Sequence, residues 1–542
     1  MKALKPNFKI SSYWIVAILF ITAKLCLHFF TNTNYELHRD EMLYFNMADH
    51  LSLGYATVPP VTGFLAFIIK GIFGYSVFGI RLIPALLGAA SLFIIAKTVR
   101  DLGGSILALI IASSAFLFST GFLLFDTLFT TNVIEQFIWL LATYFLFRMV
   151  SENNPKLWIV IAILLGVAFL NKYSVLFYIL GFFIAILFSS HRKFLNSRYL
   201  YISILIGIII ILPNLIWQYM HGWPVVYHMG ELKRTQMVNL TYSDFFIDIF
   251  SLNLAASLIW IAGLVSLLIL KKEKENRFIG VASLLIILLF LFSKGKGYYI
   301  LGLIPFLFAT GGYILEKYLK NRLNYINYVV IGITMFFSLI ALPFGIPLLS
   351  MDNLLKYKEN TAHWIIYPFY RWEDGKIHNI SQIYADMNGW KELTGYVAKA
   401  YGQLSKEEQR KCTIYAERDY GNAAAINFYG KEYNLPEAIT FLESYVMWAP
   451  DTIPDGPFIY INSEIGDIKK LFNNVREIGC INNAYSREKG LLVYLCTEPA
   501  VNVQEVYRQK AIEKRNSIVS NFMLINLFIC HNNPDSCAPE CN

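Results

Sequence analysis

The stretch Tyr35-Glu36-Leu37-His38-Arg39-Asp40-Glu41-Met42-Leu43-Tyr44 follows the first long apolar run of the chain and sets three charged residues side by side. Its pattern predicts a helix from about Arg39 to Leu51, on which Asp40 shares a face with Leu43 and Tyr44. A carboxylate that leans toward an apolar face is costly unless it has a partner. Two interpretations remain open here: an interfacial helix with solvated charges, or a site that uses the adjacent acids.

The composition is that of a polytopic membrane protein. Of the 542 residues, 56% are hydrophobic and only 15% are charged, whereas typical soluble domains carry about 25% charged residues. The positive charges cluster in short loops between apolar runs, so the net charge of +8 predicts a lipid bilayer as the partner and no nucleic acid. The first apolar run, Tyr13–Phe30, is not followed by a small-residue cleavage site, and we expect it to be a retained helix.

The apolar runs predict about eleven transmembrane helices. We expect them at 13–30, 79–98, 105–123, 127–148, 157–171, 173–188, 199–217, 251–270, 278–293, 298–315 and 325–348. The run Val61–Phe73 is too short to cross a hydrocarbon core of about 30 Å. It begins after Pro59-Pro60, which suits a first helical turn, and we expect it to be a second interfacial helix in the first outer loop.

Lysine and arginine residues fall in every second loop, which predicts the orientation of the chain. Under the positive-inside rule these loops, together with the N-terminus, lie in the cytoplasm. The opposite, outer side then receives the Arg39 helix, the loop at 218–250 and everything after about residue 350. The agreement between successive loops also supports the number of spans, because one missed span would disturb the alternation.

The composition changes near Asp352, and the sequence predicts three regions: a transmembrane domain at 1–350, a soluble α/β domain at 351–499 and a tail at 500–542. Strands are expected at 382–384, 412–416, 458–461 and 491–496, and helices at 390–401 and 465–472. The apolar stretch 519–530 is short for a twelfth span. Most of the cysteines lie after residue 400, where an exported domain would allow disulfides of unknown pairing.

Several ionisable residues are predicted at the outer membrane edge, where such residues are functional candidates by default. The acids are Asp40, Glu41 and Asp126, and the bases are Arg81, Lys172, Lys294 and Lys296. Structural roles remain open for each: a helix N-cap for Asp126, and membrane-interface anchors for the bases. His221 and His228 lie near Trp217 and Trp223, which is typical of an aromatic interface loop, although a metal site is conceivable there.

Acids and bases beside an apolar bundle suit a substrate with a lipid tail and an anionic phosphate head. Arginine and lysine would hold the phosphate, and a carboxylate would take a proton from an acceptor hydroxyl. A transporter with acidic relay residues, or a channel, is the interpretation from another functional class.

The order of several short motifs resembles a known family. The motifs are Arg39-Asp40-Glu41, Pro59-Pro60, Phe78-Gly-Ile-Arg81-Leu-Ile-Pro84, Phe125-Asp126-Thr127, Leu170-Asn171-Lys172-Tyr173, Pro213-Asn214-Leu-Ile-Trp217, His221-Gly-Trp-Pro224, and Lys296 with Tyr298-Tyr299. They resemble the dolichyl-phosphate-mannose protein mannosyltransferase-like family of the GT-C superfamily, which also holds bacterial aminoarabinose transferases that modify lipid A. The resemblance extends to about residue 498.

This resemblance implies a GT-C fold in a bacterial inner membrane, with a periplasmic C-terminal α/β domain. It implies a polyprenyl-phosphate sugar donor, with undecaprenyl phosphate as the lipid, an envelope glycolipid or glycan acceptor, and inversion at the anomeric carbon. Asp40 would be the general base, Glu41 and Asp126 would assist it, and Arg39, Arg81, Lys172 and Lys296 would hold the donor phosphate. The substrate-binding candidates are Tyr44, Trp217, His221, Trp223, Tyr298 and Tyr299.

Some relatives bind a divalent metal, and the candidate ligands here are Glu41, Asp126 and His221, although they form no tight cluster in the sequence. Two alternatives remain. A protein O-mannosyltransferase is disfavoured because a eukaryotic enzyme of this kind would carry a β-trefoil domain in a lumenal loop, whereas this chain is predicted to have an α/β domain at its C-terminus. A transporter or lipid flippase is disfavoured because the sequence shows neither internal inverted repeats nor polar residues in broken mid-membrane helices.

Overall fold

The computed structural model describes residues 11–319, 323–361 and 367–532. The chain folds into two compact units, each assembled from separate stretches of sequence. Unit 1 comprises 1–34, 77–211 and 239–381, and unit 2 comprises 35–76, 212–238 and 382–542. The division therefore does not follow chain order, because residues 35–76 and part of the 218–250 loop belong to the same unit as the C-terminal domain.

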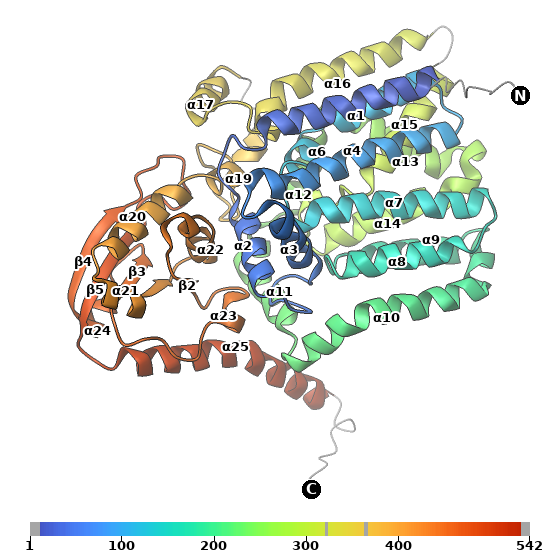
Figure 1. Cartoon of the computed structure of the whole chain (residues 1–542). Helices are drawn as coiled ribbons and strands as arrows, with labels where there is room; N and C mark the ends of the chain where they lie inside the picture. Colours follow the sequence, from blue (N-terminus) through green and yellow to red (C-terminus); the bar gives the residue numbers. More distant parts are fainter. Residues whose placement is uncertain (1–10, 320–322, 362–366, 533–542) are drawn as a thin grey trace, which may run out of the picture. The chain divides into compact units, whose positions relative to one another are not determined.

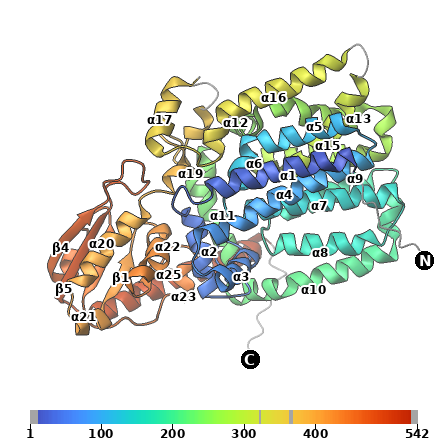
Figure 2. The same cartoon turned by 45° about the horizontal axis from the view of Figure 1, so that its top comes forward.

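Unit 1 is a bundle of helices, of which α1, α4 and α7 run side by side (Figure 1, Figure 2). The helices are α1 Ser12–Thr31, α4 Val77–Asp101, α5 Ile106–Phe118, α6 Thr120–Phe125, α7 Thr131–Ser151, α8 Leu157–Phe169, α9 Val175–Leu187, α10 Arg198–Met220, α12 Tyr242–Asn253, α13 Ser257–Ile269, α14 Arg277–Phe292, α15 Ile304–Tyr318, α16 Asn324–Gly345 and α17 Met351–Asn360. Helix α10 begins in unit 1 and ends in unit 2.

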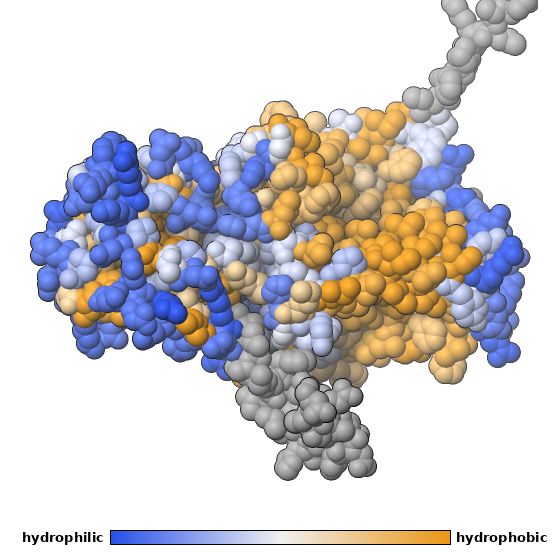
Figure 3. All heavy atoms as spheres, turned by 60° about the horizontal axis from the view of Figure 1, so that its bottom comes forward, coloured by the Kyte–Doolittle hydropathy of each residue, from blue (hydrophilic) through white to orange (hydrophobic). Residues whose placement is uncertain are grey.

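Every predicted span coincides with a helix in the described part of the chain. Within those residues, seven helical stretches are long and apolar enough to cross a membrane. The count of eleven spans stays a prediction, because α5, α8 and α9 have only 13 residues each. Apolar side chains cover much of the visible face of the helical bundle (Figure 3). Leu205 and Ile209 on α10, for example, are 59% and 60% exposed, as expected of a lipid-facing surface.

Unit 2 contains both helices of the loop between α1 and α4. Helix α2 spans Arg39–Asp49 and α3 spans Val61–Phe73, so the two helices predicted in this loop are confirmed. Helix α11, Pro224–Thr235, comes from the loop that precedes α12. Helix α2 packs against both α3 and α22 (Tyr420–Tyr429), which connects this first loop to the C-terminal domain within the unit.

The C-terminal domain is built on a mixed sheet of five strands in the described residues, in the order β2-β1-β3-β5-β4. The strands are β1 Thr413–Ala416, β2 Ala438–Ile439, β3 Phe458–Asn462, β4 Phe472–Cys480 and β5 Leu492–Pro499. Strand β1 is parallel to β2 and β3, whereas β5 is antiparallel to β3 and β4. The helices are α19 Gln382–Ala385, α20 Trp390–Gly402, α21 Lys406–Lys411, α22, α23 Tyr445–Trp448, α24 Ile468–Leu471 and α25 Val503–Asn532.

Three of the four predicted strands are confirmed, and one is wrong. The run Gln382–Tyr384 forms the start of α19, because Asp386 N–H donates to the Gln382 carbonyl and closes a helical turn. A run of three residues is too short for periodicity to separate strand from helix. Strand β4 was not predicted. It lies at the edge of the sheet, and its sequence, Phe472-Asn-Asn-Val-Arg-Glu-Ile-Gly-Cys480, is largely polar.

The predicted helix at 390–401 is confirmed as α20, and that at 465–472 is reduced to the single turn α24. The tail is helical as α25 up to Asn532, and the residues after it lie outside the described part. Among the described residues, Cys26, Cys412, Cys480 and Cys496 form no disulfide. Cys537 and Cys541, and the N-terminal lysines, lie outside the described residues.

Candidate functional site

The first turn of α2 determines where the adjacent acids point. His38 closes this turn as its N-cap: its Nδ1 accepts from Asp40 N–H at 3.2 Å, and its own N–H donates to Glu41 Oε2 at 2.9 Å. This reciprocal pairing is a capping box, with a histidine in the place of the usual serine or threonine. The carboxylate of Glu41 is therefore buried in the cap, whereas the side chain of Asp40 is 34% exposed.

Asp40 belongs to a hydrogen-bonded cluster in unit 2. The hydroxyl of Tyr420, at the start of α22, donates to Asp40 Oδ1. The guanidinium of Arg39 lies 5.3 Å from the centre of the Tyr420 ring. Arg39 also pairs with two further acids, through Nη1 to Asp419 Oδ2 at 3.2 Å and through Nε to Asp386 Oδ2 at 3.4 Å. The cluster joins α2 to two segments of the C-terminal domain.

Acidic side chains surround Arg39 in this cluster. Burial opposes the charge of Arg39, but Tyr420, Asp386 and Asp419 raise its pKa well above the ordinary value. Arg487 adds a second cation, with Nη1 at 3.4 Å from Asp386 Oδ1. Arg39, which the resemblance assigned to the donor phosphate, is thus held by carboxylates of its own unit, and its phosphate role stays a prediction.

Glu443 is a fourth acid of this cluster that the sequence did not reveal. Burial, together with the charges of Asp40 and Asp419, raises the pKa of Glu443 to about 7, against the opposing effect of Arg39. Its backbone has φ +52°, a left-handed conformation that is uncommon for a glutamate and is often found at functional sites. No sequence signal marks it, because its partners are far away in the chain.

The aromatic candidates of unit 2 have structural contacts within that unit. Trp217 stacks on His221 with ring centres 4.2 Å apart, and the Trp217 ring fills the space that a Cβ on Gly54 would need. Trp223 has φ +55° where α11 begins. Tyr44 is buried on α2, with 5% of its surface exposed.

The lysine candidates of unit 1 are brought together around two tyrosines. The Nζ atoms of Lys172 and Lys296 lie 5.8 Å and 6.0 Å from the centre of the Tyr298 ring, and Lys172 lies 4.4 Å from that of Tyr299. Lys172 follows α8, whereas Lys296 and the tyrosines lie between α14 and α15. Two cations on one aromatic pair form a surface suited to an anion.

Each of these lysines also contacts a carboxylate. Lys172 Nζ lies 3.1 Å from Glu135 Oε2 and donates to Asn132 Oδ1 at 2.7 Å. Lys296 Nζ lies 2.7 Å from Glu373 Oε1. Burial lowers the pKa of Lys296, but Glu373 and Tyr299 raise it by more, so that the ammonium stays charged.

Asp126 contacts a lysine of α1, and Arg81 contacts Asn32, the residue that follows α1. Asp126 Oδ2 forms an ion pair with Lys24 Nζ at 2.7 Å, and both side chains are buried. Arg81 is fully buried, and its Nη1 donates to the Asn32 carbonyl at 2.7 Å. Lys24 was missed, although a single lysine in an apolar helix is a recognisable sign of an intramembrane partner. The catalytic role of Asp126 and the phosphate role of Arg81 stay predictions.

The metal candidates have other bonds in this structure. Glu41 closes the α2 cap, and His221 Nδ1 pairs with the Trp217 carbonyl at 2.8 Å. Within residues 11–319, 323–361 and 367–532, no group of three or more His, Cys, Asp or Glu side chains is arranged to hold a metal ion. The metal assignment therefore gains no geometric support from the described side chains.

Comparison with known proteins places the chain in a fold class. The family described as dolichyl-phosphate-mannose-protein mannosyltransferase matches residues 57–217. The structure resembles that of ArnT from Cupriavidus metallidurans bound to undecaprenyl phosphate, with a TM-score of 0.61 and 12% identity over 90% of this chain and 98% of that one. The apo structure of the same protein gives a TM-score of 0.57 at 13% identity. The chain has the GT-C membrane fold with a C-terminal sheet domain, as predicted from the sequence.

A curated relative is also similar in sequence. Lipid A galacturonosyltransferase RgtD from Rhizobium johnstonii is 28% identical over 198 residues. The matched region is 36% of this chain and 41% of the relative, so this chain spans less than half the length of that protein. The resemblance inferred from the motifs is confirmed as a similarity to this family over residues 57–217, and the substrates of these relatives remain statements about those proteins.

We predict that replacing Lys24 by Met lowers stability strongly. Loss of the ammonium leaves Asp126 charged and buried, which costs about 3–5 kcal/mol when one partner of a buried pair is removed. Thermal unfolding of the detergent-solubilised protein checks this. The double variant Lys24→Met with Asp126→Asn removes both charges and should recover most of the loss. A single variant that unfolds at the wild-type temperature would contradict the prediction.

We predict that Glu443 makes stability fall as the pH rises. With a folded pKa of about 7 against an ordinary 4.5, the folded protein holds a proton that the unfolded chain releases between these values. Stability is therefore highest below about pH 4.5 and declines up to about pH 7, by roughly 1–3 kcal/mol for a partly exposed group. The variant Glu443→Gln should have a shallower slope than the wild type, measured as melting temperature from pH 5 to 8, because Glu488, whose pKa burial raises to about 7, still contributes. The exposed Glu464→Gln serves as control, and parallel curves for wild type and Glu443→Gln would refute the assignment.

Proposed function

We propose that the protein is a membrane glycosyltransferase that moves a sugar from a polyprenyl-phosphate donor to a hydroxyl group of an envelope glycolipid, with lipid A as the first candidate. Support comes from the family match over residues 57–217, from the similarity to a lipid A galacturonosyltransferase and from the fold shared with ArnT. The glycan of another envelope component is the nearest alternative acceptor.

The reaction would be a single displacement that inverts the anomeric carbon. The acceptor oxygen attacks C1 of the sugar, the C1–O bond to the phosphate breaks, and its electron pair stays on the phosphate oxygen. The acceptor proton passes to a carboxylate, and the product phosphate leaves as an anion that needs no proton. The protein must therefore supply one base and several cations.

This proposal rests mainly on the position of Asp40. It is an acid on the first turn of α2 whose side chain reaches solvent, while Glu41 beside it is buried in the helix cap. The N-terminus of a helix favours a charged carboxylate, and the Tyr420 hydroxyl orients one of its oxygens. The other oxygen, Oδ2, lies 3.8 Å from His38 Nδ1 and would take the proton of the acceptor hydroxyl. We assign Asp40 as the general base and Glu41 as the residue that positions its helix.

The donor phosphate would bind at Lys172 and Lys296. Both ammonium groups lie beside Tyr298 and are partly exposed, at 21% and 19% of their side chains. A phosphate would replace Glu373 as the partner of Lys296, because the donor phosphodiester carries one negative charge and gains a second as the C1–O bond breaks. As negative charge grows on the leaving phosphate, these preplaced cations stabilise the transition state.

The proposed location follows from the donor. A lipid-linked sugar is used where nucleotide sugars are absent, which is the periplasmic face of a bacterial inner membrane. We propose a multi-pass protein with a cytoplasmic N-terminus and a periplasmic domain that contains the sheet of β1–β5. The division into 1–350, 351–499 and 500–542 remains part of this proposal.

We predict that Asp40→Asn reduces sugar transfer by about 10²–10⁴-fold, because the amide cannot accept the proton. The measurement is mass spectrometry of envelope glycolipids from a deletion strain that carries each variant. The same substitution at Asp49, at the far end of α2, is the matched control, since Asp49 pairs with Lys70 and Tyr75 at the surface. It should leave transfer intact.

Loss of one sugar mass in both the deletion strain and the Asp40→Asn strain would identify the sugar and the acceptor together. Normal transfer by Asp40→Asn would remove Asp40 as the base. Unchanged glycolipids in the deletion strain would direct the search to protein acceptors, and then to transport of a lipid.

We predict that Lys296→Met weakens binding of undecaprenyl phosphate by about tenfold or more, because a charged hydrogen bond contributes about 1.5–3 kcal/mol. Binding to the purified protein in nanodiscs checks this. Lys294→Met is the matched control, since Lys294 lies two residues away and is exposed. Glu373→Gln should strengthen binding, because it removes the competing carboxylate. Equal affinities for wild type and Lys296→Met would exclude Lys296 from the phosphate site.

A further inference from the structure

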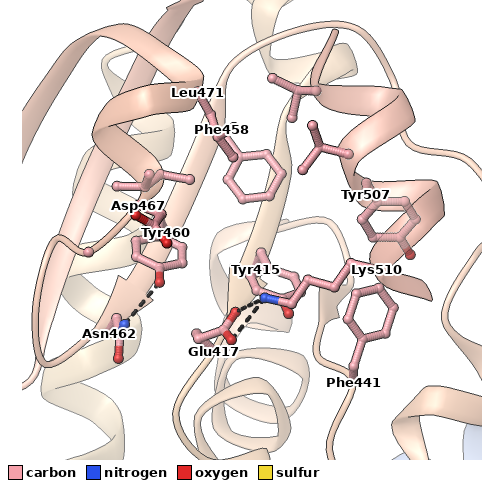
Figure 4. A pocket seen from close by; sticks show the side chains of 14 residues that line it. Tyr415, Glu417, Phe441, Phe458, Tyr460, Asn462, Asp467, Leu471, Tyr507 and Lys510 are labelled. Carbon is pink, nitrogen blue, oxygen red and sulfur yellow. Dashed lines mark hydrogen bonds and ion pairs between the residues drawn. The ribbon is translucent and has the colours of Figure 1, made fainter. Parts of the chain in front are cut away.

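Unit 2 contains a cavity of about 280 Å³ that has no part in the proposed reaction. It lies between one face of the sheet and α25, and its lining includes residues of β1, β3 and α24 (Figure 4). Asp40, Glu443 and the other members of their cluster do not line it. Its volume is near the lower limit of small-molecule sites, which suits a ligand of a single ring.

The topology of the sheet places this cavity where α/β domains bind ligands. Strand β1 has β2 on one side and β3 on the other, and all three strands are parallel. The chain passes from β1 to β2 and then returns across β1 to form β3, so the strand order reverses between β1 and β3. Ligands of open α/β sheets bind outside the carboxyl ends of the strands at such a point. Glu417 and Asn462 stand at the carboxyl ends of β1 and β3 and line the cavity.

The walls of the cavity are mainly aromatic. Tyr415 and Tyr460 are paired across the two strands, and their rings are nearly parallel, at 4° with centres 6.4 Å apart. Phe441 meets Tyr415 edge to face at 5.6 Å, and Tyr507 on α25 lies 5.2 Å from Phe441. Figure 4 shows Tyr415 and Tyr460 on the strands and Tyr507 on α25, with Phe441, from the segment after β2, beside Tyr507. Aromatic rings present negative faces, which attract the polarised C–H groups of a sugar ring.

Polar groups at the edge of the cavity complete the lining. Lys510 on α25 donates to both oxygens of Glu417, at 2.9 Å and 2.7 Å, so the two charges cancel. The Asn462 amide donates to the Tyr460 hydroxyl at 2.9 Å. Together these side chains offer both donors and acceptors for hydroxyl groups, without a net charge from the Glu417–Lys510 pair.

We infer that this cavity binds one neutral sugar ring, with its C–H face on Tyr415 and Tyr460 and its hydroxyl groups on Glu417, Lys510 and Asn462. The inference goes beyond the proposed transferase activity and does not depend on it. A purely apolar ligand would leave the polar edge without partners. Both acids of the lining are already paired, Glu417 with Lys510 and Asp467 with Lys470, so a charged ligand would have to break an ion pair.

The test uses the full chain in nanodiscs and saturation-transfer difference NMR with the methyl glycosides of glucose, galactose and N-acetylglucosamine. Hexan-1-ol is the apolar comparison probe. We expect at least one glycoside to bind, and Val506→Trp to weaken it tenfold or more by filling the cavity from α25. Val501→Trp is the matched control, because Val501 is exposed and does not line the cavity. Tyr460→Leu, which removes a stacking ring, should have the effect of Val506→Trp.

If a lipopolysaccharide core oligosaccharide competes with the glycoside, the natural ligand of the cavity is a sugar within a glycan chain. If it does not compete, the natural ligand is a free monosaccharide. Binding that persists at full strength in Val506→Trp, or binding of hexan-1-ol without any glycoside, would overturn the inference. Asp40→Asn should keep glycoside binding while it loses transfer, so a failure of the transferase proposal and a failure of this one are distinguishable.

Discussion

The ion pairs of Arg39 hold unit 2 in its observed form. They join α2, near the start of the chain, to Asp386 and to Asp419, which lies 380 residues away. Asp386 is almost wholly buried, with 1% of its surface exposed. Its charge is tolerable only while a cation compensates it, because an uncompensated buried charge costs several kcal/mol. The orientation of α2, and with it the direction of Asp40, therefore depends on charge compensation and not on apolar packing alone.

In unit 1 a buried charge is likewise compensated by a partner of opposite charge. Lys24 is a lysine in the middle of an apolar helix, and Asp126 is its partner. The Lys24 Nζ also donates to the Phe122 carbonyl at 3.0 Å, so the ammonium binds the end of α6 by both its charge and its hydrogen bond. Gly88 on α4 leaves the space that the Asp126 carboxylate occupies, since a Cβ there would lie 2.4 Å from Asp126 Oδ2. In both units a buried pair determines which segments meet, whereas the apolar surface is similar along many helices.

The sequence predicted the features that depend on local patterns. The bounds of α3 and the start of α2 follow from apolar runs and from Pro59-Pro60, and β3 follows from a short apolar run. Lys172 and Lys296 were predicted to share a phosphate role with Arg39 and Arg81. The structure brings the two lysines together at Tyr298, and the phosphate role stays a prediction. The structure alone revealed Glu443, the pairing of Arg39 with Asp419 and the cavity under α25. Each depends on contacts between distant segments, and no periodicity within one segment records them.

Adjacent acids need not act as a pair, and α2 shows the reason. Successive residues on a helix point about 100° apart, so Asp40 and Glu41 leave the helix in different directions. The capping box buries the Glu41 carboxylate at the N-terminus of the helix. The Asp40 side chain stays partly exposed and accepts a hydrogen bond from the Tyr420 hydroxyl. A base needs one accessible carboxylate, held in a fixed direction by neighbours that do not themselves titrate with it. In the proposed mechanism the Arg39-Asp40-Glu41 motif therefore supplies one reactive acid, one cation paired with carboxylates and one cap, with each role set by its angle on the helix.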